Sequence, residues 1–234
     1  MEDIFRIGIL AGMGPRSTAP FLEAVLDECE RQYGAKFDED FPHILVYSLP
    51  TPFHPKKPLD QDRMRKALKI GIETLSRGDV QIIAIPCNVV HLYYDQMQAM
   101  TDIPILHIVK ETMEAMDNTP SKVGLLATRA TVESGLYQSH FAQKEKTLYW
   151  DESFQNHVDE LIYKVKRQGV SDEVFTLWKS IENLLIENHV REIVCACTDL
   201  FFCRQNSSLR FYDSSQILAS SLVKEYIRGK QRLK

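Results

Sequence analysis

Residues 80–87 (VQIIAIPC) are matched 110 positions later by residues 190–197 (VREIVCAC). A second pair, residues 5–11 (FRIGILA) and 121–127 (SKVGLLA), repeats at an offset of 116. Each segment is largely apolar, as expected for a parallel strand that is covered on both faces. The two similar offsets predict two related halves, each of which places a cysteine just after a strand.

Further apolar patterns predict the elements around these repeats. Short, partly β-branched runs predict buried strands at residues 4–10, 43–49, 80–85, 105–108, 122–127 and 192–196. Amphipathic spacing predicts helices at residues 18–30, 63–75, 159–166 and 174–187, and a last helix at residues 215–228. Strands that alternate with helices are typical of an α/β fold with parallel sheets.

The sequence therefore predicts an α/β fold of two similar lobes, each a parallel sheet flanked by helices, related by a pseudo-twofold axis with the active site between them. We expect residues 1–98 to form the first lobe, completed by a C-terminal helix within residues 210–234, and residues 99–209 to form the second. Ligands of open parallel sheets bind outside the carboxyl ends of the strands, where both Cys87 and Cys197 fall. Two facing lobes would put these thiols on opposite sides of one cleft.

The composition argues against several classes of protein. The chain has 234 residues, of which 44% are hydrophobic, and its formal net charge of −4 lacks the basic surplus of a nucleic-acid-binding protein. Its first residues lack the positive charge of a secretory signal, and no apolar run approaches the ~18 residues that span a bilayer. Five cysteines without such a signal indicate reduced thiols. We expect a cytoplasmic protein that binds neither nucleic acid nor membrane.

Two of the cysteines have the setting of reactive groups. Cys87 precedes Asn88, a good N-cap residue, and a thiol at a helix N-terminus has a pKa below its usual value of about 8.5. Cys197 precedes Thr198 and Asp199 in the equivalent place. Either cysteine alone is more often a small buried hydrophobe, but their equivalence in the two halves favours function.

The other cysteines and one histidine give weaker signals. Cys29 lies on the apolar face of a predicted helix and Cys195 in a predicted strand, so both are expected in the core, while Cys203 is left unassigned. The spacing of the last three cysteines is not the Cys-x-x-Cys of a zinc site, so no metal site is predicted. His91 lies four residues after Cys87 and could tune its pKa or serve a structural role.

A glycine-rich stretch, residues 8–15 (GILAGMGP), joins the first predicted strand to the first predicted helix. Backbone N–H groups in such a turn can bind an anion, for example a carboxylate or a phosphate. The spacing also fits a dinucleotide loop, but the catalytic Tyr-x-x-x-Lys of the corresponding dehydrogenases occurs only in the tail, at Tyr226 and Lys230. A turn that needs only flexible glycines is the remaining alternative.

Taken together, these residues resemble the aspartate/glutamate racemase superfamily, most closely its aspartate racemase branch, along nearly the whole chain. The matching positions are residues 8–15, 86–88, 103–108, 124–128, 162–163 and 197–199, with Thr131, Tyr137, Lys166 and Gly169. The fold of that family is the two-lobed arrangement predicted above.

The resemblance implies a racemase that acts on a small-molecule amino acid without pyridoxal phosphate or a metal. One thiolate removes the Cα proton and the second thiol returns a proton on the other face, with Cys87 serving the D-enantiomer and Cys197 the L-enantiomer. The implied substrate-binding residues are Met13, Gly14, Thr51, Asn88, Thr128, Thr131, Lys166, Thr198 and Asp199. The family is often dimeric, so a homodimer is a candidate state.

The chain departs from the family pattern where an acidic side chain is recognised. Racemases of dicarboxylic amino acids commonly carry an arginine after the second strand, and residues 49–57 (LPTPFHPKK) contain none. Val89, Ala130 and Ala196 stand where threonine, glycine and glycine are usual. We therefore expect a substrate range that is not strictly acidic.

Three other functions stay open from the sequence. A related isomerase, hydantoin racemase or decarboxylase would share the fold and the use of cysteine. An amino-acid-binding protein would keep the fold without catalysis, and a cysteine hydrolase would pair Cys87 with His91 as its base. The presence of both repeat cysteines favours the racemase.

Overall fold

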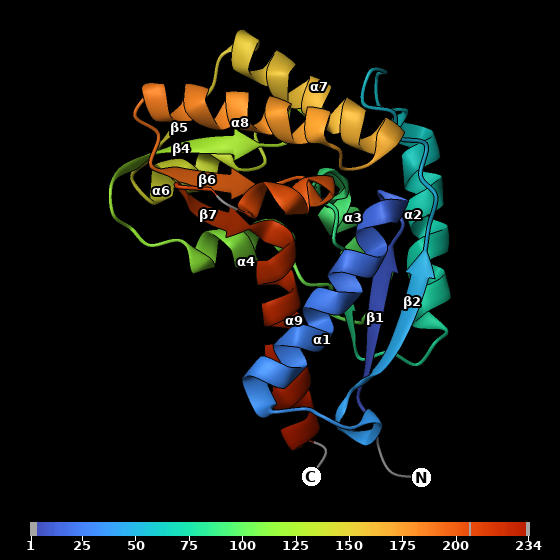
Figure 1. Ribbon diagram of the computed structural model, residues 1–234. Helices are drawn as coiled ribbons and strands as arrows, with labels where there is room; N and C mark the ends of the chain where they lie inside the picture. Colours follow the sequence, from blue (N-terminus) through green and yellow to red (C-terminus); the bar gives the residue numbers. More distant parts are fainter. Residues whose placement is uncertain (1–3, 206, 233–234) are drawn as a thin grey trace.

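The computed structural model describes residues 4–205 and 207–232. The protein contains two parallel sheets flanked by helices (Figure 1). The first sheet has the order β2-β1-β3, with β1 at Arg6–Ala11, β2 at His43–Ser48 and β3 at Ile82–Ala84. The second has the order β5-β4-β6-β7, with β4 at Ser121–Leu126, β5 at Lys146–Tyr149, β6 at Glu192–Cys195 and β7 at Arg210–Asp213. The predicted fold class is confirmed.

The two sheets repeat one topology. β1 lies between β2 and β3, and β4 lies between β5 and β6, with every pairing parallel. β3 and β6, which precede the two repeat cysteines, are buried at every position. The repeated segments of the sequence are therefore structurally equivalent strands.

Helices cover the sheets and connect their strands. Their bounds are α1 Thr18–Tyr33, α2 Gln61–Ser76, α3 Tyr94–Gln98, α4 Ile108–Ala115, α5 Arg129–Glu133, α6 Gln138–Gln143, α7 Glu152–Gln168, α8 Asp172–Glu187 and α9 Ser214–Arg232, with 3-10 turns η1 Pro15–Ser17, η2 Asp38–Asp40, η3 Val89–Tyr93 and η4 Thr198–Arg204. Side-chain caps fix several starts, since Asp60, Asp151 and Ser171 each accept a backbone N–H of the helix that follows. Within the described part of the chain, no helix combines the length and apolar character needed to cross a membrane.

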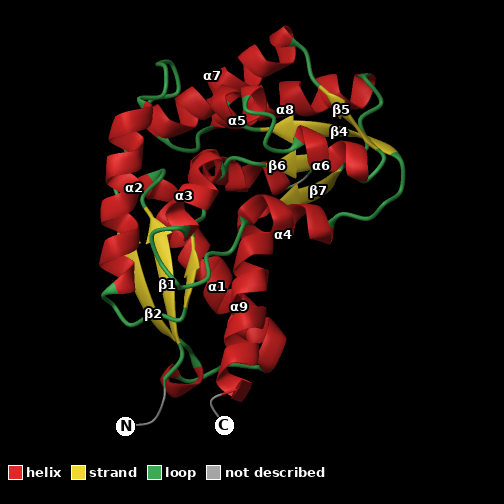
Figure 2. Cartoon of the chain, turned by 180° about the vertical axis from the view of Figure 1, so that it is seen from behind, coloured by secondary structure: helices red, strands yellow, loops and turns green. Residues whose placement is uncertain are grey.

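One apolar core joins the lobes. Phe21 of α1, Val109 of α4 and Leu222 of α9 pack in the same cluster as Ile7 of β1 and Val123 of β4. Figure 2 shows α1 and α9 side by side beneath the second sheet. Because the helices of this core contact both sheets, the core holds the carboxyl ends of the two sheets toward each other.

The structure differs from the sequence prediction in the secondary elements with the weakest apolar signal. Residues 105–108 do not form the predicted strand, because Ile105 makes only an isolated bridge to Ile83 and α4 already begins at Ile108. β5 and β7 were not predicted, since they are the edge strands of their sheet and their partly exposed residues interrupt the apolar run. Residues 210–213 form β7, so the C-terminal helix begins at Ser214. The lobe boundaries stay a prediction, and residues 1–3, 206 and 233–234 of those ranges lie outside the described residues.

Candidate active site

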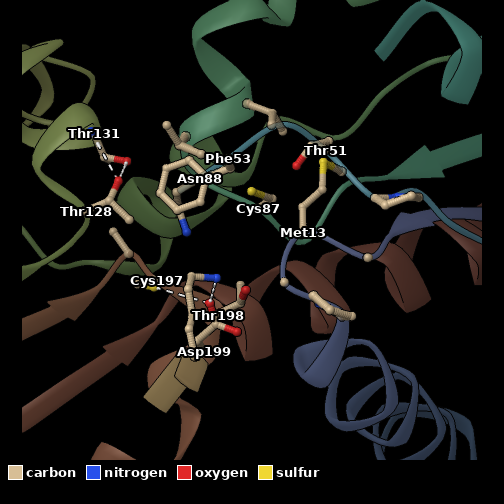
Figure 3. A pocket seen from close by; sticks show the side chains of 18 of the residues that line it. Met13, Thr51, Phe53, Cys87, Asn88, Thr128, Thr131, Cys197, Thr198 and Asp199 are labelled. Atoms are coloured by element: carbon tan, nitrogen blue, oxygen red, sulfur yellow. Dashed lines mark hydrogen bonds and ion pairs between the residues drawn. The ribbon is translucent and has the colours of Figure 1, made fainter. Parts of the chain in front are cut away.

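A cavity of about 440 Å³ lies between the carboxyl ends of the two sheets. Its walls are the segments that follow β1, β2, β3, β4 and β6, together with one side chain of α7 (Figure 3). The structure brings every predicted site residue to this one cavity, namely Met13, Gly14, Thr51, Cys87, Asn88, Thr128, Thr131, Lys166, Cys197, Thr198 and Asp199. The roles predicted for them stay a proposal, which the contacts below make specific.

Cys87 and Cys197 reach the cavity from different lobes (Figure 3). Cys87 follows β3 and Cys197 follows β6, and both are more than nine-tenths buried. Cys29, Cys195 and Cys203 are buried away from the cavity wall, as was expected for the first two. All five thiols are buried, and Cys87 and Cys197 differ from the other three because they line the cavity.

Burial dominates the acidity of both cavity thiols. It raises the pKa of Cys87 to about 11, although backbone N–H groups of the following turn and the Lys166 ammonium act in the opposite direction. It raises the pKa of Cys197 to about 12, and the Asp199 carboxylate adds to that rise. The prediction that a helix N-terminus lowers the pKa of Cys87 is wrong as a net effect. Burial destabilises the thiolate more than the nearby N–H groups stabilise it.

Asn88 does not cap a helix with its side chain, contrary to the prediction. It precedes the 3-10 turn η3 and makes no capping hydrogen bond. Its Oδ1 instead accepts a hydrogen bond from the Tyr137 hydroxyl at 2.6 Å, and its Nδ2 donates to Ser214 Oγ at 3.0 Å. A residue of the first lobe is thus held by one group before α6 and another at the start of α9.

Hydroxyl groups line the rest of the polar wall. Thr128 caps α5 by accepting the Thr131 N–H, and the hydroxyls of these two residues lie 2.9 Å apart. The Thr198 hydroxyl donates to Ser17 Oγ at 3.3 Å, and Ser17 donates to the Gly14 carbonyl at 2.8 Å. Hydroxyls and the N–H groups of the glycine-rich turn are suitable donors for a carboxylate.

The cavity contains an ion pair of its own. Lys166 Nζ lies 2.5 Å from Asp199 Oδ2, and Cys197 Sγ lies 4.0 Å from the same oxygen. Burial lowers the pKa of Lys166, but the Asp199 carboxylate and the thiols outweigh burial and leave the pKa raised. A Cβ on Gly14 would lie 2.8 Å from Asp199 Oδ1 and 3.0 Å from Lys166 Nζ, so a side chain there would displace the ends of the ion pair.

The loop after β2 brings an aromatic ring to the cavity and a lysine to the other lobe. Phe53 lines the cavity, and Lys166 Nζ lies 5.5 Å from its ring centroid. Lys56 Nζ lies 3.4 Å from a Glu160 carboxylate oxygen and 3.7 Å from the centroid of the Tyr163 ring, both on α7. No arginine is present among the described residues that line the cavity.

His91 does not face the Cys87 thiol as a general base would. Its Nδ1 lies 2.8 Å from the backbone oxygen of Cys87, and its Nε2 accepts the Ile108 N–H at 3.3 Å. Burial lowers the pKa of His91, which favours the neutral ring. Both ring nitrogens are engaged with backbone, so the structural interpretation of His91 is favoured over the hydrolase base.

The apolar wall of the cavity and the residues that support Asn88 were not predicted from the sequence. The additional lining residues are Gly12, Pro15, Ser48, Pro50, Phe53, Val89, Val90 and Ala196, and the support comes from Tyr137 and Ser214. Phe53 stands in a proline-rich loop without a periodic pattern, so no local signal places it. The resemblance included Tyr137 but gave it no role.

Metal binding was not predicted, and the described ranges 4–205 and 207–232 contain no group of three or more His, Cys, Asp or Glu side chains arranged to hold a metal ion. The absence of a cofactor stays a prediction.

Comparison with known proteins gives matches along nearly the whole chain. The family described as Asp/Glu/Hydantoin racemase matches residues 10–222. The chain is 38% identical over 223 residues to a protein of Bacillus subtilis (strain 168) named broad specificity amino-acid racemase RacX, covering 94% of this chain and 98% of that protein. The aspartate racemase of Picrophilus torridus has a TM-score of 0.80 and 23% identity, with 98% of both chains covered. A glutamate racemase from Francisella tularensis in complex with D-glutamate has a TM-score of 0.68 and 17% identity, with 97% of this chain and 82% of that chain covered, so these two structures share the fold.

Proposed function

Because the chain belongs to the Asp/Glu/hydantoin racemase family and is an amino-acid racemase, we propose that Cys87 and Cys197 are the acid–base pair that inverts Cα. The observation that carries this proposal is the pair of buried thiols at equivalent strand ends of the two halves, on the wall of one cavity. Inversion through a planar carbanion requires a base on one face of Cα and an acid on the other. Two thiols from facing lobes meet that requirement.

In the proposed reaction, the Cys87 thiolate removes the Cα proton of the D-enantiomer, and the Cys197 thiol donates its proton to the opposite face. The reverse direction exchanges the two roles. Both thiols have raised pKa values in this structure, so the reacting thiolate needs a nearby positive charge. The α-ammonium group of the substrate supplies one, because an opposite charge within a few ångströms favours the ionised thiol, and the Lys166 ammonium acts in the same direction at Cys87, where its effect exceeds that of Asp199.

The carbanion is stabilised in this proposal by the groups that hold the α-carboxylate. One hydroxyl of the Thr128–Thr131 pair, the Asn88 amide and the N–H groups around Gly14 have protons available at the cavity, whereas the Thr198 proton is donated to Ser17. Preorganised donors of this kind stabilise negative charge strongly in a site from which water is excluded. The proposed mechanism therefore uses neither pyridoxal phosphate nor a metal.

We propose further that the substrate range is not strictly acidic. The Lys166 ammonium, the one Lys or Arg cation among the described lining residues, is already paired with Asp199, so a distal carboxylate would meet a second carboxylate beside it. The guanidinium fork that binds a carboxylate in bidentate fashion is not among the described lining residues. Phe53, Val89 and Val90 give neutral side chains an apolar wall. The name of the Bacillus subtilis relative, a broad specificity amino-acid racemase, is consistent with this proposal.

Incorporation of solvent deuterium at Cα tests the proposal. The protein, dialysed against EDTA and free of pyridoxal phosphate, is incubated in D2O with both enantiomers of alanine, serine, leucine, aspartate and glutamate, and NMR measures the exchange. We expect exchange and racemisation of several neutral amino acids. Exchange with no amino acid would overturn the acid–base role, and a preference for acidic substrates above about a thousandfold, roughly 4 kcal/mol, would overturn the specificity.

The same assay separates the alternatives that the sequence left open. A saturable shift of protein resonances without Cα exchange would identify a binding protein. Exchange at C5 of a 5-substituted hydantoin, without exchange of free amino acids, would identify a hydantoin racemase.

A further inference from the structure

A buried chain of hydrogen bonds runs behind the cavity from one lobe to the other. The Tyr137 hydroxyl lies 2.6 Å from Asn88 Oδ1, Asn88 Nδ2 lies 3.0 Å from Ser214 Oγ, and Ser214 Oγ lies 2.7 Å from the Cys195 carbonyl oxygen. All four residues are at most 2% exposed. The chain therefore connects the residue next to Cys87 with the strand that precedes Cys197.

The direction of each hydrogen bond follows from the one before it. A backbone carbonyl can only accept, so the single proton of the Ser214 hydroxyl is used by Cys195. Ser214 Oγ must then accept from Asn88, which requires the NH2 group of the amide, and not its oxygen, to face Ser214. The amide oxygen consequently faces Tyr137, whose hydroxyl donates to it. The orientation of an amide is often ambiguous, but here a backbone carbonyl determines it.

One proton of the Asn88 amide remains for the cavity. Nδ2 carries two protons, and Ser214 uses one of them. No described residue accepts the second, and Asn88 lines the cavity next to Cys87. We propose that Tyr137 and Ser214 are positioning residues that keep this N–H, instead of the amide oxygen, directed at the carboxylate of the substrate. The effect on rate rests on the racemase proposed above, whereas the orientation of the amide does not.

The support of Ser214 is itself rigid. Ser214 is the first residue of α9, and Asp213 Oδ1 accepts the N–H groups of Ser215 at 2.9 Å and Gln216 at 3.3 Å. β7, which ends at Asp213, pairs with β6 in the register that places Cys195 beside Asp213. The two strands therefore fix the distance between Ser214 and the Cys195 carbonyl.

Loss of either support would let the amide turn. A rotation of the Asn88 amide by half a turn would remove a donor from the substrate carboxylate and direct a carbonyl oxygen at it. Both changes destabilise the carbanion, which carries more negative charge at the carboxylate than the substrate does. The variants should therefore lower kcat more than they raise KM.

Tyr137→Phe and Ser214→Ala test the effect on the reaction. Tyr137→Phe keeps the ring and removes only the donor. We expect kcat for Cα exchange to fall by about tenfold to a hundredfold, somewhat less than the 10²- to 10³-fold loss typical when an oxyanion donor is deleted. Because both residues act on one amide, the double variant should be little slower than the slower single variant.

Tyr33→Phe is the matched control. It also removes a tyrosine hydroxyl that donates a hydrogen bond, here to the backbone carbonyl of Asp40 at 2.9 Å, but at the far end of α1 and outside the cavity wall. We expect it to lower the melting temperature without changing kcat. If Tyr137→Phe behaves in the same way, with reduced stability and an unchanged kcat, the positioning role is overturned.

NMR of the Asn88 side-chain amide, assigned with an Asn88→Asp variant, tests the orientation without any activity. In the wild type we expect one Nδ2 proton to exchange slowly with solvent, and Tyr137→Phe and Ser214→Ala should each accelerate that exchange. If the wild type exchanges no Cα proton but the amide responds as expected, the proposed function fails and the orientation stands. If the wild type is active and the amide is unprotected, or does not respond to the variants, the positioning inference fails and the proposed function stands.

Discussion

The Cys87 side and the Cys197 side of the cavity occupy equivalent places in the two lobes but differ in charge. Cys87 is followed by the neutral Asn88, whose amide is held in the interlobe chain. Cys197 lies 4.0 Å from the Asp199 carboxylate, which is paired with Lys166. The pKa is raised to about 11 for Cys87 and to about 12 for Cys197. The two cysteines therefore have equivalent backbone positions in the two halves, but the charges around their thiols differ.

This asymmetry can be measured only in the half-reactions, in which one thiol removes the Cα proton of one enantiomer. The two enantiomers of an amino acid have the same free energy, so kcat/KM of the complete racemisation is equal in both directions whatever the two pKa values are. Removing one thiol at a time separates the faces.

The largest effect is expected from Cys87→Ser and Cys197→Ser. Each variant should lose racemisation by about a thousandfold, because catalysis by one acid–base group is worth roughly 10²- to 10⁴-fold and a hydroxyl is a far weaker base than a thiol. Cys197→Ser should still exchange the Cα proton of the D-form through Cys87, and Cys87→Ser that of the L-form through Cys197. Deuterium uptake by each pure enantiomer measures this.

Cys29→Ser and Cys203→Ser are the controls, since both thiols are fully buried but neither lines the cavity. They should reduce stability and keep the wild-type rate. Wild-type racemisation by Cys87→Ser, or exchange of the same enantiomer by both cavity variants, would contradict the two-thiol mechanism.

The pH dependence should be the next largest effect. A pKa above neutral pH means that the thiol carries its proton at pH 7 and that the thiolate fraction rises with pH. We expect kcat/KM of the wild type, which reports the free enzyme, to rise between pH 6 and 8 by up to about tenfold per pH unit. At any one pH, L-exchange by Cys87→Ser should be slower than D-exchange by Cys197→Ser, because the Asp199 carboxylate adds to the rise in the pKa of Cys197. A flat profile, or the opposite order, would show that the charges inferred for the two sides are wrong.

Asp199→Asn should make the two sides more alike. It removes the carboxylate beside Cys197 and leaves the Lys166 ammonium without its partner in the cavity. We expect kcat/KM for aspartate relative to alanine to increase by about tenfold, which corresponds to about 1.4 kcal/mol. The ratio is measured with both substrates at one pH and low salt.

Asp159→Asn is the matched control for that charge change. Asp159 is also paired with a cation, Arg129 at 2.9 Å, but it does not line the cavity. The aspartate-to-alanine ratio should not change in this variant. An equal change in both variants would show that net charge alone, and not the ion pair in the cavity, sets the preference.

Much of the fold and the predicted site could be inferred because the signal is repeated. Residues 80–87 and 190–197 have the same apolar pattern, so each supports the strand assigned to the other, and both lead to a cysteine. Edge strands lack that pattern, since β5 and β7 are only four residues long and each includes residues that are not buried. Residues 105–108 show the opposite error, because a buried apolar run can begin a helix as readily as it forms a strand.

The parts of the site that the sequence did not predict depend on contacts between distant segments. The pairing of Lys166 with Asp199 joins α7 to the turn after β6, and no local pattern indicates that these charges neutralise each other. The effect of burial on the thiols is of the same kind. The motif around Cys87 predicts a lowered pKa, whereas the packing of both lobes around the thiol raises it.

The smallest effect on the reaction is expected from a substitution in the loop after β2, which contacts α7 of the other lobe. Lys56 belongs to this loop and contacts Glu160 and Tyr163 on α7, the helix that carries Lys166. Lys56→Met keeps an unbranched side chain but removes the charge, so Phe53 should be held less firmly against the cavity. We expect KM for neutral amino acids to rise by about two- to threefold with kcat unchanged, and the free energy of unfolding to fall by less than about 1 kcal/mol, because the pair is exposed.

Lys57→Met is the control for this variant, because it removes the same charge from the next residue. None of the described interactions with α7 involves the Lys57 side chain, which is exposed. Its KM should equal that of the wild type. If the two variants raise KM equally, the effect comes from the charge of the loop and not from the contact with α7. If Lys56→Met lowers kcat instead of raising KM, the loop acts on the thiols themselves, and the comparison between the two sides of the cavity must then include the loop.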